Sequence, residues 1–293
     1  MPATTQSDGV RPRRAWWRPH AVGALVAAGT LAAAAVTPGA AATTFEATYA
    51  ISVAGLTIGT AEAKGRFTDT RYAATITGNT SGISRLVSDA RALLLGEGRL
   101  TRDRPLPGSY DLETREGDFE THVRMKLSAG TVTDLLVIPR LSRHPDRIPL
   151  EPEHKQNVID PVAAFLAVAD TPEIGDGSRI CRRTIKVFDG WQRYDIRLTY
   201  KQTRRVNGSG DAYDGRVLVC SARYVPVAGH RMSLKATRYM TENERLEVWY
   251  APVKDRRLLV PYRILIGTTY GDLVIVATRF VAAESDAKPA VGN

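Results

Sequence analysis

The stretch from Cys181 to His230 decides the fold: CRRTIKVFDGWQRYDIRLTY (181–200), KQTRRVNGSGDAYDGRVLVC (201–220) and SARYVPVAGH (221–230). Asp189-Gly190 separates two runs rich in β-branched and aromatic residues. Asp-Gly between such runs is typical of a β-hairpin with a type I′ turn, which needs positive φ at both central residues. We therefore expect an antiparallel hairpin here.

The second strand of this hairpin alternates, which predicts one apolar face and one charged face. The apolar face would hold Tyr194, Ile196, Leu198 and Tyr200, and the solvent face would hold Arg193, Asp195, Arg197 and Thr199. This pattern indicates a half-buried antiparallel strand.

The same stretch holds the two cysteines of the chain, Cys181 and Cys220, the latter expected at the end of a strand over 216–220. Two cysteines allow one internal pairing, which would close a loop of about 40 residues and stabilise the fold by roughly 3–4 kcal/mol. The alternative is two buried free thiols. We do not expect a catalytic thiol, because no CxxC pattern accompanies either residue.

Several short motifs together resemble an exported bacterial family of unknown function, DUF3108. They are Phe188-Asp-Gly190 with Arg193-Tyr-Asp195, Cys220 with Tyr224-Val-Pro-Val-Ala-Gly-His230, Gly55-Leu-Thr-Ile-Gly59, Asp160-Pro161, Glu247-Val-Trp249 and Val260-Pro-Tyr-Arg263. The resemblance covers most of the chain after its first 42 residues. It implies a fold and export, and it implies no activity.

The N-terminus is typical of a secretory signal peptide. Four arginines between positions 11 and 18 precede an uncharged apolar run, Ala21–Val36, which Pro38 and the small residues Ala40–Ala42 follow. We expect cleavage near Ala42, with an uncleaved anchor as the alternative; the arginine pair at 13–14 leaves the twin-arginine route open. The expected organisation is a signal peptide over 1–42, one β-rich domain over 43–284 and a flexible tail over 285–293.

The chain carries a formal charge of +9, and residues 1–42 hold four of the 40 Lys and Arg and one of the 31 Asp and Glu. Their removal would leave +6. Exported proteins keep disulfides, so export favours the pairing of the two cysteines. We expect no nucleic-acid partner, because no aromatic-basic recognition motif is present. Solvated strand faces account for the basic residues, and attraction to anionic lipid or envelope polysaccharide is the alternative.

Alternating runs predict a meander of antiparallel strands on both sides of the central stretch. They cover 45–53, 60–67, 72–77, 109–115, 120–127, 132–138, 232–239, 246–250, 258–267 and 273–281. Residues 81–95 fit a helix or a continued sheet. The fold expected is mainly β, a curved antiparallel sheet or incomplete barrel packed around one or two helices, similar in architecture to the periplasmic LolA/LolB carriers.

Residues 161–169, after Asp160, predict a buried helix, because Asp is a favoured N-cap and Pro fits the first turn. The run PVAAFLAVA is apolar almost all round, so the helix should pack against the sheet. It either plugs an apolar cavity or belongs to the core. Residues 141–157, with three prolines, predict a long loop.

No catalytic constellation is evident, and we expect no metal, no cofactor and no enzymatic activity. Histidines and acids between 144 and 154 share one loop without metal-ligand spacing. The weak candidates for ligand contact are Phe165, Trp191, Arg193, Tyr194, His230 and Trp249. Each of them is also explained by core packing or, for His230, by a hydrogen bond at a corner.

These features lead to three hypotheses. The first is a non-enzymatic periplasmic protein that binds an apolar or amphipathic ligand, such as a lipid, or an envelope protein, in the concavity of its sheet. The second is an envelope hydrolase or polysaccharide-modifying enzyme, using His230 with Asp195 and Arg193. The third is a structural scaffold without a pocket. No stable membrane anchor is expected after signal cleavage.

Overall fold

The computed structural model describes residues 42–81 and 89–285, and the fold within them is a large antiparallel sheet. The expected signal peptide, apart from its last residue, lies outside the described residues, and so do 82–88 and most of the expected tail. The expected mainly β class is confirmed: one open sheet of fourteen strands, with few and short helices.

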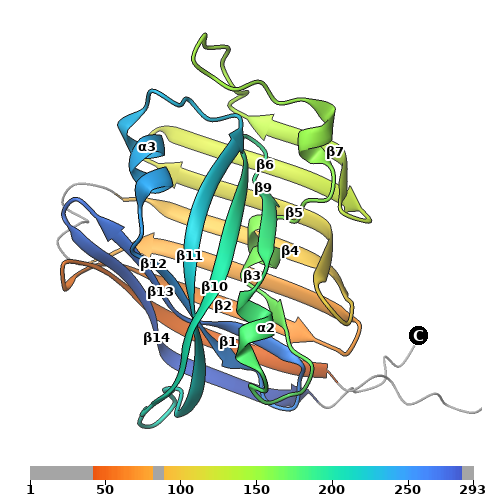
Figure 1. Ribbon diagram of the computed structural model, residues 1–293, viewed down its shortest axis with the longest axis vertical. Helices are drawn as coiled ribbons and strands as arrows, with labels where there is room; N and C mark the ends of the chain where they lie inside the picture. The colour runs from red at the N-terminus through yellow and green to blue at the C-terminus, as the bar shows by residue number, and fades with distance from the viewer. Residues whose placement is uncertain (1–41, 82–88, 286–293) are drawn as a thin grey trace, which may run out of the picture. The chain divides into compact units, whose positions relative to one another are not determined.

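Seven consecutive strands form the first half of the sheet (Figure 1). They are β1 (Ala42–Val53), β2 (Leu56–Phe67), β3 (Arg71–Thr80), β4 (Arg91–Leu100), β5 (Pro105–Glu116), β6 (Phe119–Ser128) and β7 (Thr131–Ile138). Each pairs with its neighbour in sequence, which is the meander that the alternation predicted. Of the ambiguous segment 81–95, the part from Arg91 is strand.

The second half is another meander, joined to the first by pairing of β1 with β14. Its strands are β9 (Thr184–Phe188), β10 (Arg193–Val206), β11 (Gly215–Ala228), β12 (Leu246–Pro252), β13 (Leu258–Thr268) and β14 (Gly271–Ser285), and the short β8 (Ala167–Val168) pairs with β13. The order runs from β7 through β1 and β14 to β9, so the two edges do not close. Figure 1 shows β9, β10 and β11 crossing in front of β3 to β6.

The Asp189-Gly190 hairpin forms, but its turn differs from the prediction. Gly190 has φ of 106°, whereas Asp189 has no positive φ, and the turn extends to Gln192. The Asp189 carboxylate holds it by accepting hydrogen bonds from the backbone N–H of Trp191 (2.8 Å) and Gln192 (2.7 Å). A two-residue turn with two positive φ values occurs instead at Ala54-Gly55, between β1 and β2.

The predicted faces of β10 are wrong at both ends of the run 193–200, and the strand itself continues to Val206. Arg193 is buried, and Tyr200 is 40% exposed. The register shifts between Arg193 and Tyr194 and again after Tyr200, and a bulge of this kind turns side chains away from simple alternation. Strand β11 also continues eight residues beyond Cys220, where the sequence indicated an end.

The expected strand over 232–239 is wrong, because this segment forms α3 (Lys235–Glu242). Within the described residues, segment 232–239 pairs with no strand, so a helix satisfies its backbone groups locally. None of the α3 residues is buried. The alternation that suggested a strand therefore did not report burial.

The expected buried helix after Asp160 is much shorter than predicted. Helix α1 covers Pro161–Ala164, and the chain then enters β8, whose residues pair with Leu258 and Leu259 of β13. This pairing supplies the backbone hydrogen bonds that a longer helix would have made. Two further short helices are present. One is α2 (Gly177–Cys181), and the other is a 3-10 turn, η2 (Pro152–Lys155), which lies inside the loop expected over 141–157.

Helix α1 covers one face of the sheet, which we call the inner face. It contacts β4, β5 and β9, and so joins strands from both halves. The core residues around it come from the same two halves, with Met125 and Val123 of β6 packed near Phe188 of β9. The largest fully buried side chains in this part of the core are Tyr110, Phe188, Met125, Val123, Val158 and Val162.

Candidate functional site

Asp160 and Pro161 start the segment around which the candidate site is built. The Asp160 Oδ1 accepts a hydrogen bond of 2.9 Å from the Ala163 backbone, as an N-cap does. Val162 then packs against β4 so closely that a Cβ on Gly96 would lie 2.7 Å from it. Glycine at position 96 therefore sets how near α1 approaches the sheet.

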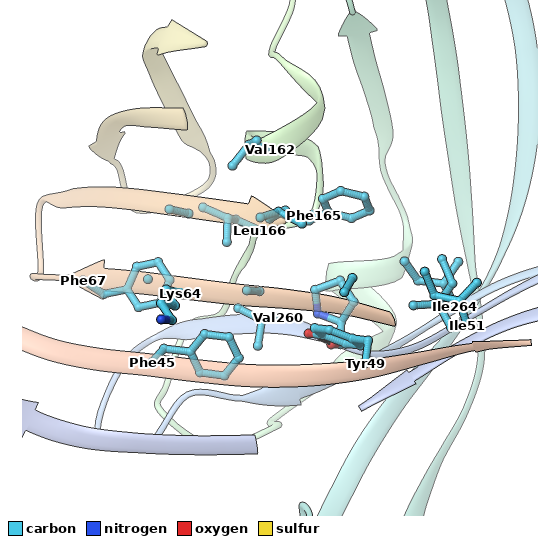
Figure 2. A pocket seen from close by; sticks show the side chains of 17 residues that line it. Phe45, Tyr49, Ile51, Lys64, Phe67, Val162, Phe165, Leu166, Val260 and Ile264 are labelled. Atoms are coloured by element: carbon cyan, nitrogen blue, oxygen red, sulfur yellow. Dashed lines mark hydrogen bonds between the residues drawn. The ribbon is translucent and has the colours of Figure 1, made fainter. Parts of the chain in front are cut away.

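Beyond Val162 the packing is incomplete, and a cavity of about 140 Å³ lies between the α1 segment and the inner face (Figure 2). Phe45 and Tyr49 of β1, Val260 and Ile264 of β13, and Phe165 and Leu166 are among the residues that line it. An engineered apolar cavity of about 150 Å³ binds benzene, so this volume admits part of an apolar ligand.

A second cavity, of about 290 Å³, lies beside the same segment. Its lining includes Tyr194, Ile196, Tyr224, Val248, Tyr250 and Ile266, with Met240 of α3. Phe165 and Ile264 line both cavities, so the Phe165 ring stands where the two meet. Among the described residues, the linings include one charged residue each, Lys64 and Glu247, and both alternate along their strands with the inward-facing residues.

Small residues on β2 and β3 account for the first cavity. Ala61, Ala63 and Gly65 occupy successive inward positions of β2. Ala74 occupies an inward position of β3. The ring of Phe67 already covers Gly65, whose added Cβ would lie 2.6 Å from it. Alternating small residues on β2 are thus the sequence signal for the cavity.

Of the six weak candidates for ligand contact, Phe165 and Tyr194 lie in these linings. Trp191, Arg193, His230 and Trp249 are not among the residues that line either cavity. Ligand contact by Phe165 and Tyr194 stays a prediction. Tyr224 and Ile264, which the sequence did not single out, belong beside them.

Arg193 and Asp195 form an ion pair of 2.7 Å with side chains only 7% and 16% exposed. The Arg193 guanidinium also donates to the Tyr194 carbonyl at 2.6 Å. Its Nη1 group is therefore bound within the fold, at the strand end where the bulge turns this side chain inward. A buried pair of this kind tolerates loss of one partner poorly.

His230 lies beside the Arg193 backbone and is 2% exposed. Its Nε2 lies 3.2 Å from the Arg193 carbonyl oxygen, and its ring packs edge-on against Tyr224. Burial lowers the pKa of His230 from its ordinary value. These contacts fit the role of a corner residue, and they leave the imidazole outside the cavity linings.

Trp249 lies between two arginines. The guanidinium carbons of Arg204 and Arg263 lie 5.1 Å and 4.9 Å from its ring centroid, and its indole N–H donates to Glu247 at 2.8 Å. Cation–π contacts of this kind stabilise an aromatic side chain by about 0.5–1 kcal/mol at exposed sites. Trp191, in turn, donates its indole N–H to the Pro139 carbonyl at 2.9 Å.

Asp160 is fully buried, and burial raises its pKa to about 7. Its Oδ2 makes no hydrogen bond within the described residues, and neither does the Tyr72 hydroxyl. After burial, the charge of Asp160 is the next cause that raises the pKa of Tyr72 and of Tyr110. A buried acid and two phenols therefore lie close together beside the start of α1.

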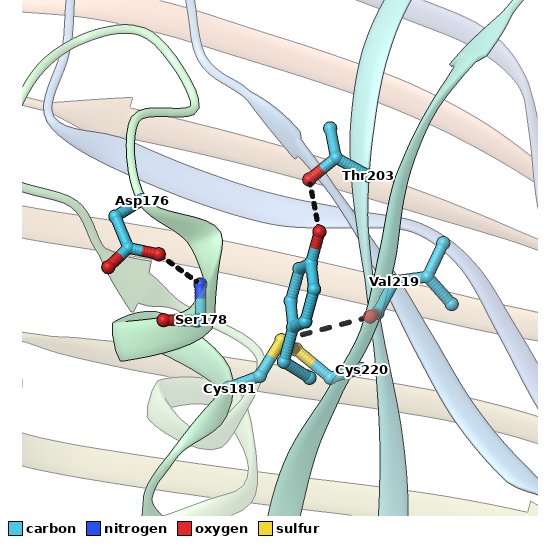
Figure 3. Close-up of a disulfide and its surroundings, with 7 residues drawn as sticks. Asp176, Ser178, Cys181, Thr203, Val219 and Cys220 are labelled. Carbon is cyan, nitrogen blue, oxygen red and sulfur yellow. Dashed lines mark hydrogen bonds between the residues drawn. A yellow bond between two sulfur atoms is a disulfide. The ribbon is translucent and has the colours of Figure 1, made fainter.

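Cys181 and Cys220 form the expected disulfide (Figure 3). It joins the end of α2 to the middle of β11, with the two Cα atoms 5.4 Å apart and 39 residues apart in sequence. A closed loop of this length stabilises the fold by about 4 kcal/mol in the chain-entropy model. Both residues are completely buried.

A family profile described as a protein of unknown function, DUF3108, matches residues 44–278. The chain belongs to the DUF3108 family. The family description carries no activity, so function has to come from the site itself.

A solved structure similar to this DUF3108 member is a β-barrel-like protein of domain of unknown function DUF1849 from Brucella abortus. The identity is 8%, the TM-score is 0.45, and the match covers 84% of this chain and 99% of the other. No curated protein matches the chain. The likeness to LolA/LolB carriers stays an analogy of architecture.

The described residues of this DUF3108 chain were compared with the patterns of metal sites and of membrane-spanning helices. Within residues 42–81 and 89–285, no group of three or more His, Cys, Asp or Glu residues is placed to hold a metal ion. In the loop expected over 141–157, the Nδ1 atoms of His144 and His154 accept hydrogen bonds from nearby backbone N–H groups. No helix among the described residues has the length and apolarity to cross a membrane.

Proposed function

We propose that this DUF3108 protein is a non-enzymatic periplasmic binding protein for an apolar or amphipathic ligand, with a lipid acyl chain as the favoured class. The observation that carries the proposal is the pair of apolar cavities, of about 140 and 290 Å³, on either side of Phe165. Together they reach the range of about 300–1,000 Å³ that is usual for small-molecule sites.

The linings suit a hydrocarbon chain better than a polar substrate. Aliphatic and aromatic side chains dominate both cavities, and apolar surface leaving water stabilises a complex by about 25 cal/mol per Å². Phe165 is held by the short α1–β8 segment and not by a long helix, so its ring is the side chain that an entering chain would displace.

The periplasmic location rests on two features of the chain. One is the order of basic, apolar and small residues at its start, and the other is the buried disulfide between Cys181 and Cys220. Disulfides persist outside the reducing cytoplasm. Intact-mass measurement of the protein recovered from the periplasm tests the expected cleavage near Ala42.

Native mass spectrometry and lipid extraction of the purified protein test the proposal. We expect a co-purifying apolar molecule in the wild type and its loss in Ala61→Phe, which fills the first cavity. Thr60→Phe, at the neighbouring exposed position of β2, is the matched control and should retain the molecule. A protein that carries nothing, and takes up no added lipid, would contradict the proposal.

A further inference from the structure

The two ends of the strands differ in character, and the difference follows from strand direction. Because consecutive strands are antiparallel, turns 54–55, 117–118 and 269–270 and the connection that holds α3 all lie at one end of the strands. Figure 1 shows α3 and the turns β1–β2 and β13–β14 on its left side. Turns 68–70, 101–104 and 253–257 lie at the other end.

Large apolar side chains are exposed at the first end. Tyr270 is 84% exposed, Phe119 83%, Leu56 61%, Leu234 43% and Met232 38%. The turns at the opposite end read Thr-Asp-Thr, Thr-Arg-Asp-Arg and Val-Lys-Asp-Arg-Arg, and in the described residues none of the exposed large apolar side chains lies in them. Exposed apolar side chains gathered at one place mark an interaction surface.

Three of these segments are tied together. The backbone N–H of Ala54 donates to the Asp272 carbonyl (3.0 Å), and the Asn243 side chain, just after α3, donates to the Gly267 carbonyl (2.8 Å). Arg245 pairs with Asp272 at 2.5 Å. We use the term docking rim for the exposed residues that these three segments carry: Leu56, Met232, Leu234, Lys235, Arg238 and Tyr270.

The charged residues of the docking rim indicate which kind of partner it binds. Lys235 and Arg238 lie on exposed α3, directly after the exposed Met232 and Leu234, and make no ion pair among the described residues. Of the acidic side chains nearby, Asp146 accepts a hydrogen bond from the Ser233 backbone N–H and Glu244 pairs with Arg223, while Glu242 lies at the far end of α3. Phe119 is different, because acidic residues at 116, 118 and 120 surround it. Apolar and aromatic side chains beside Lys and Arg are the pattern of surfaces that lie on anionic bilayers.

We propose that the docking rim binds the surface of an anionic phospholipid bilayer. Tyr270 and Leu56 enter the head-group region, while Lys235 and Arg238 face the lipid phosphates. Met240 of α3 lines the second cavity, so docking by this rim brings that cavity to the membrane surface. The proposal concerns membrane attachment and stands apart from ligand binding in the cavities.

Vesicle flotation tests the proposal, with full-length protein expressed in cells and its N-terminus read by intact mass. All variants are compared in the same processed form. The vesicles contain either phosphatidylcholine alone or a mixture with phosphatidylglycerol. We expect binding to the mixed vesicles, and a fall of about tenfold or more in Lys235→Gln/Arg238→Gln, since each basic residue near an anionic surface contributes about 1 kcal/mol.

Leu56→Ser/Tyr270→Ser should weaken binding to the mixed vesicles by at least about tenfold, because two exposed apolar anchors are lost. Phe119→Ser removes an equally exposed aromatic side chain from the acidic turn, and it should bind as the wild type does. Equal loss in Phe119→Ser, equal binding to both kinds of vesicle, or no binding to either would overturn the proposal. Ligand retention in the same variants, read by native mass spectrometry, keeps this test separate from that of the cavities.

Discussion

The two sides of the α1 segment are packed differently, although they belong to one short stretch of chain. On the side of β4 and β6, Val162 meets Gly96, and Met125 and Val123 have no exposed surface. On the side of β1, β2 and β13, small inward residues leave cavities around Phe165. The difference teaches that one face of this sheet serves both as core and as candidate binding site, according to the size of the side chains opposite α1.

The largest expected effect comes from truncating one large side chain on each side of the α1 segment and comparing the losses in stability. Met125→Ala should lower the free energy of unfolding by about 2–5 kcal/mol, because it opens a new cavity in filled core. Ile264→Ala should cost less, since its side chain already borders empty space. Urea unfolding of both variants measures the difference, and equal losses would mean that the two sides are packed alike.

The buried carboxylate beside α1 gives the next effect, which depends on pH. The folded pKa of Asp160, about 7, lies above its ordinary value of 3.8, so the folded state binds the proton more tightly than the unfolded state does. The free energy of unfolding should therefore fall as pH rises from 4 to 7, by at most about 4 kcal/mol from this group, and stay level above.

Asp160→Asn isolates that effect, because Asn also caps a helix and carries no charge. The variant should lose this part of the pH dependence, and it should match or exceed the wild type in stability at pH 8. Asp160→Ala is the control and should be less stable than Asp160→Asn at every pH, by about 1 kcal/mol from the lost cap. Parallel stability curves for the wild type and Asp160→Asn between pH 5 and 8 would refute the assignment.

A smaller effect concerns how closely the helix approaches the sheet. Gly96→Ala should destabilise the protein by about 1–3 kcal/mol, because the new Cβ would lie 2.7 Å from Val162. Gly78→Ala is the matched control on β3, where the nearest atom is 3.9 Å away, and it should be neutral or mildly stabilising. Thermal unfolding compares the two, and similar shifts would show that position 96 does not set the approach.

The sequence predicted most of the strands, because alternation usually reports which side of a strand is buried; it failed over 232–239, where the segment forms α3. It also predicted the pairing of Cys181 and Cys220. It could not predict the end of α1, which depends on β13, about 90 residues away, nor the buried Arg193, which a bulge turns inward. The cavities combine the side chains of strands far apart in the chain, so their volume cannot be predicted from any one segment.

The central claim is that the space around Phe165 receives an apolar ligand. Titration with a fluorescent fatty acid, monitored by its emission, tests it most directly in the wild type, in Ala61→Phe and in Thr60→Phe. We predict saturable binding to the wild type and to Thr60→Phe, and binding at least about tenfold weaker in Ala61→Phe, since a tenfold change needs only 1.4 kcal/mol. Unchanged affinity in Ala61→Phe, or no saturable binding to the wild type, would contradict the account.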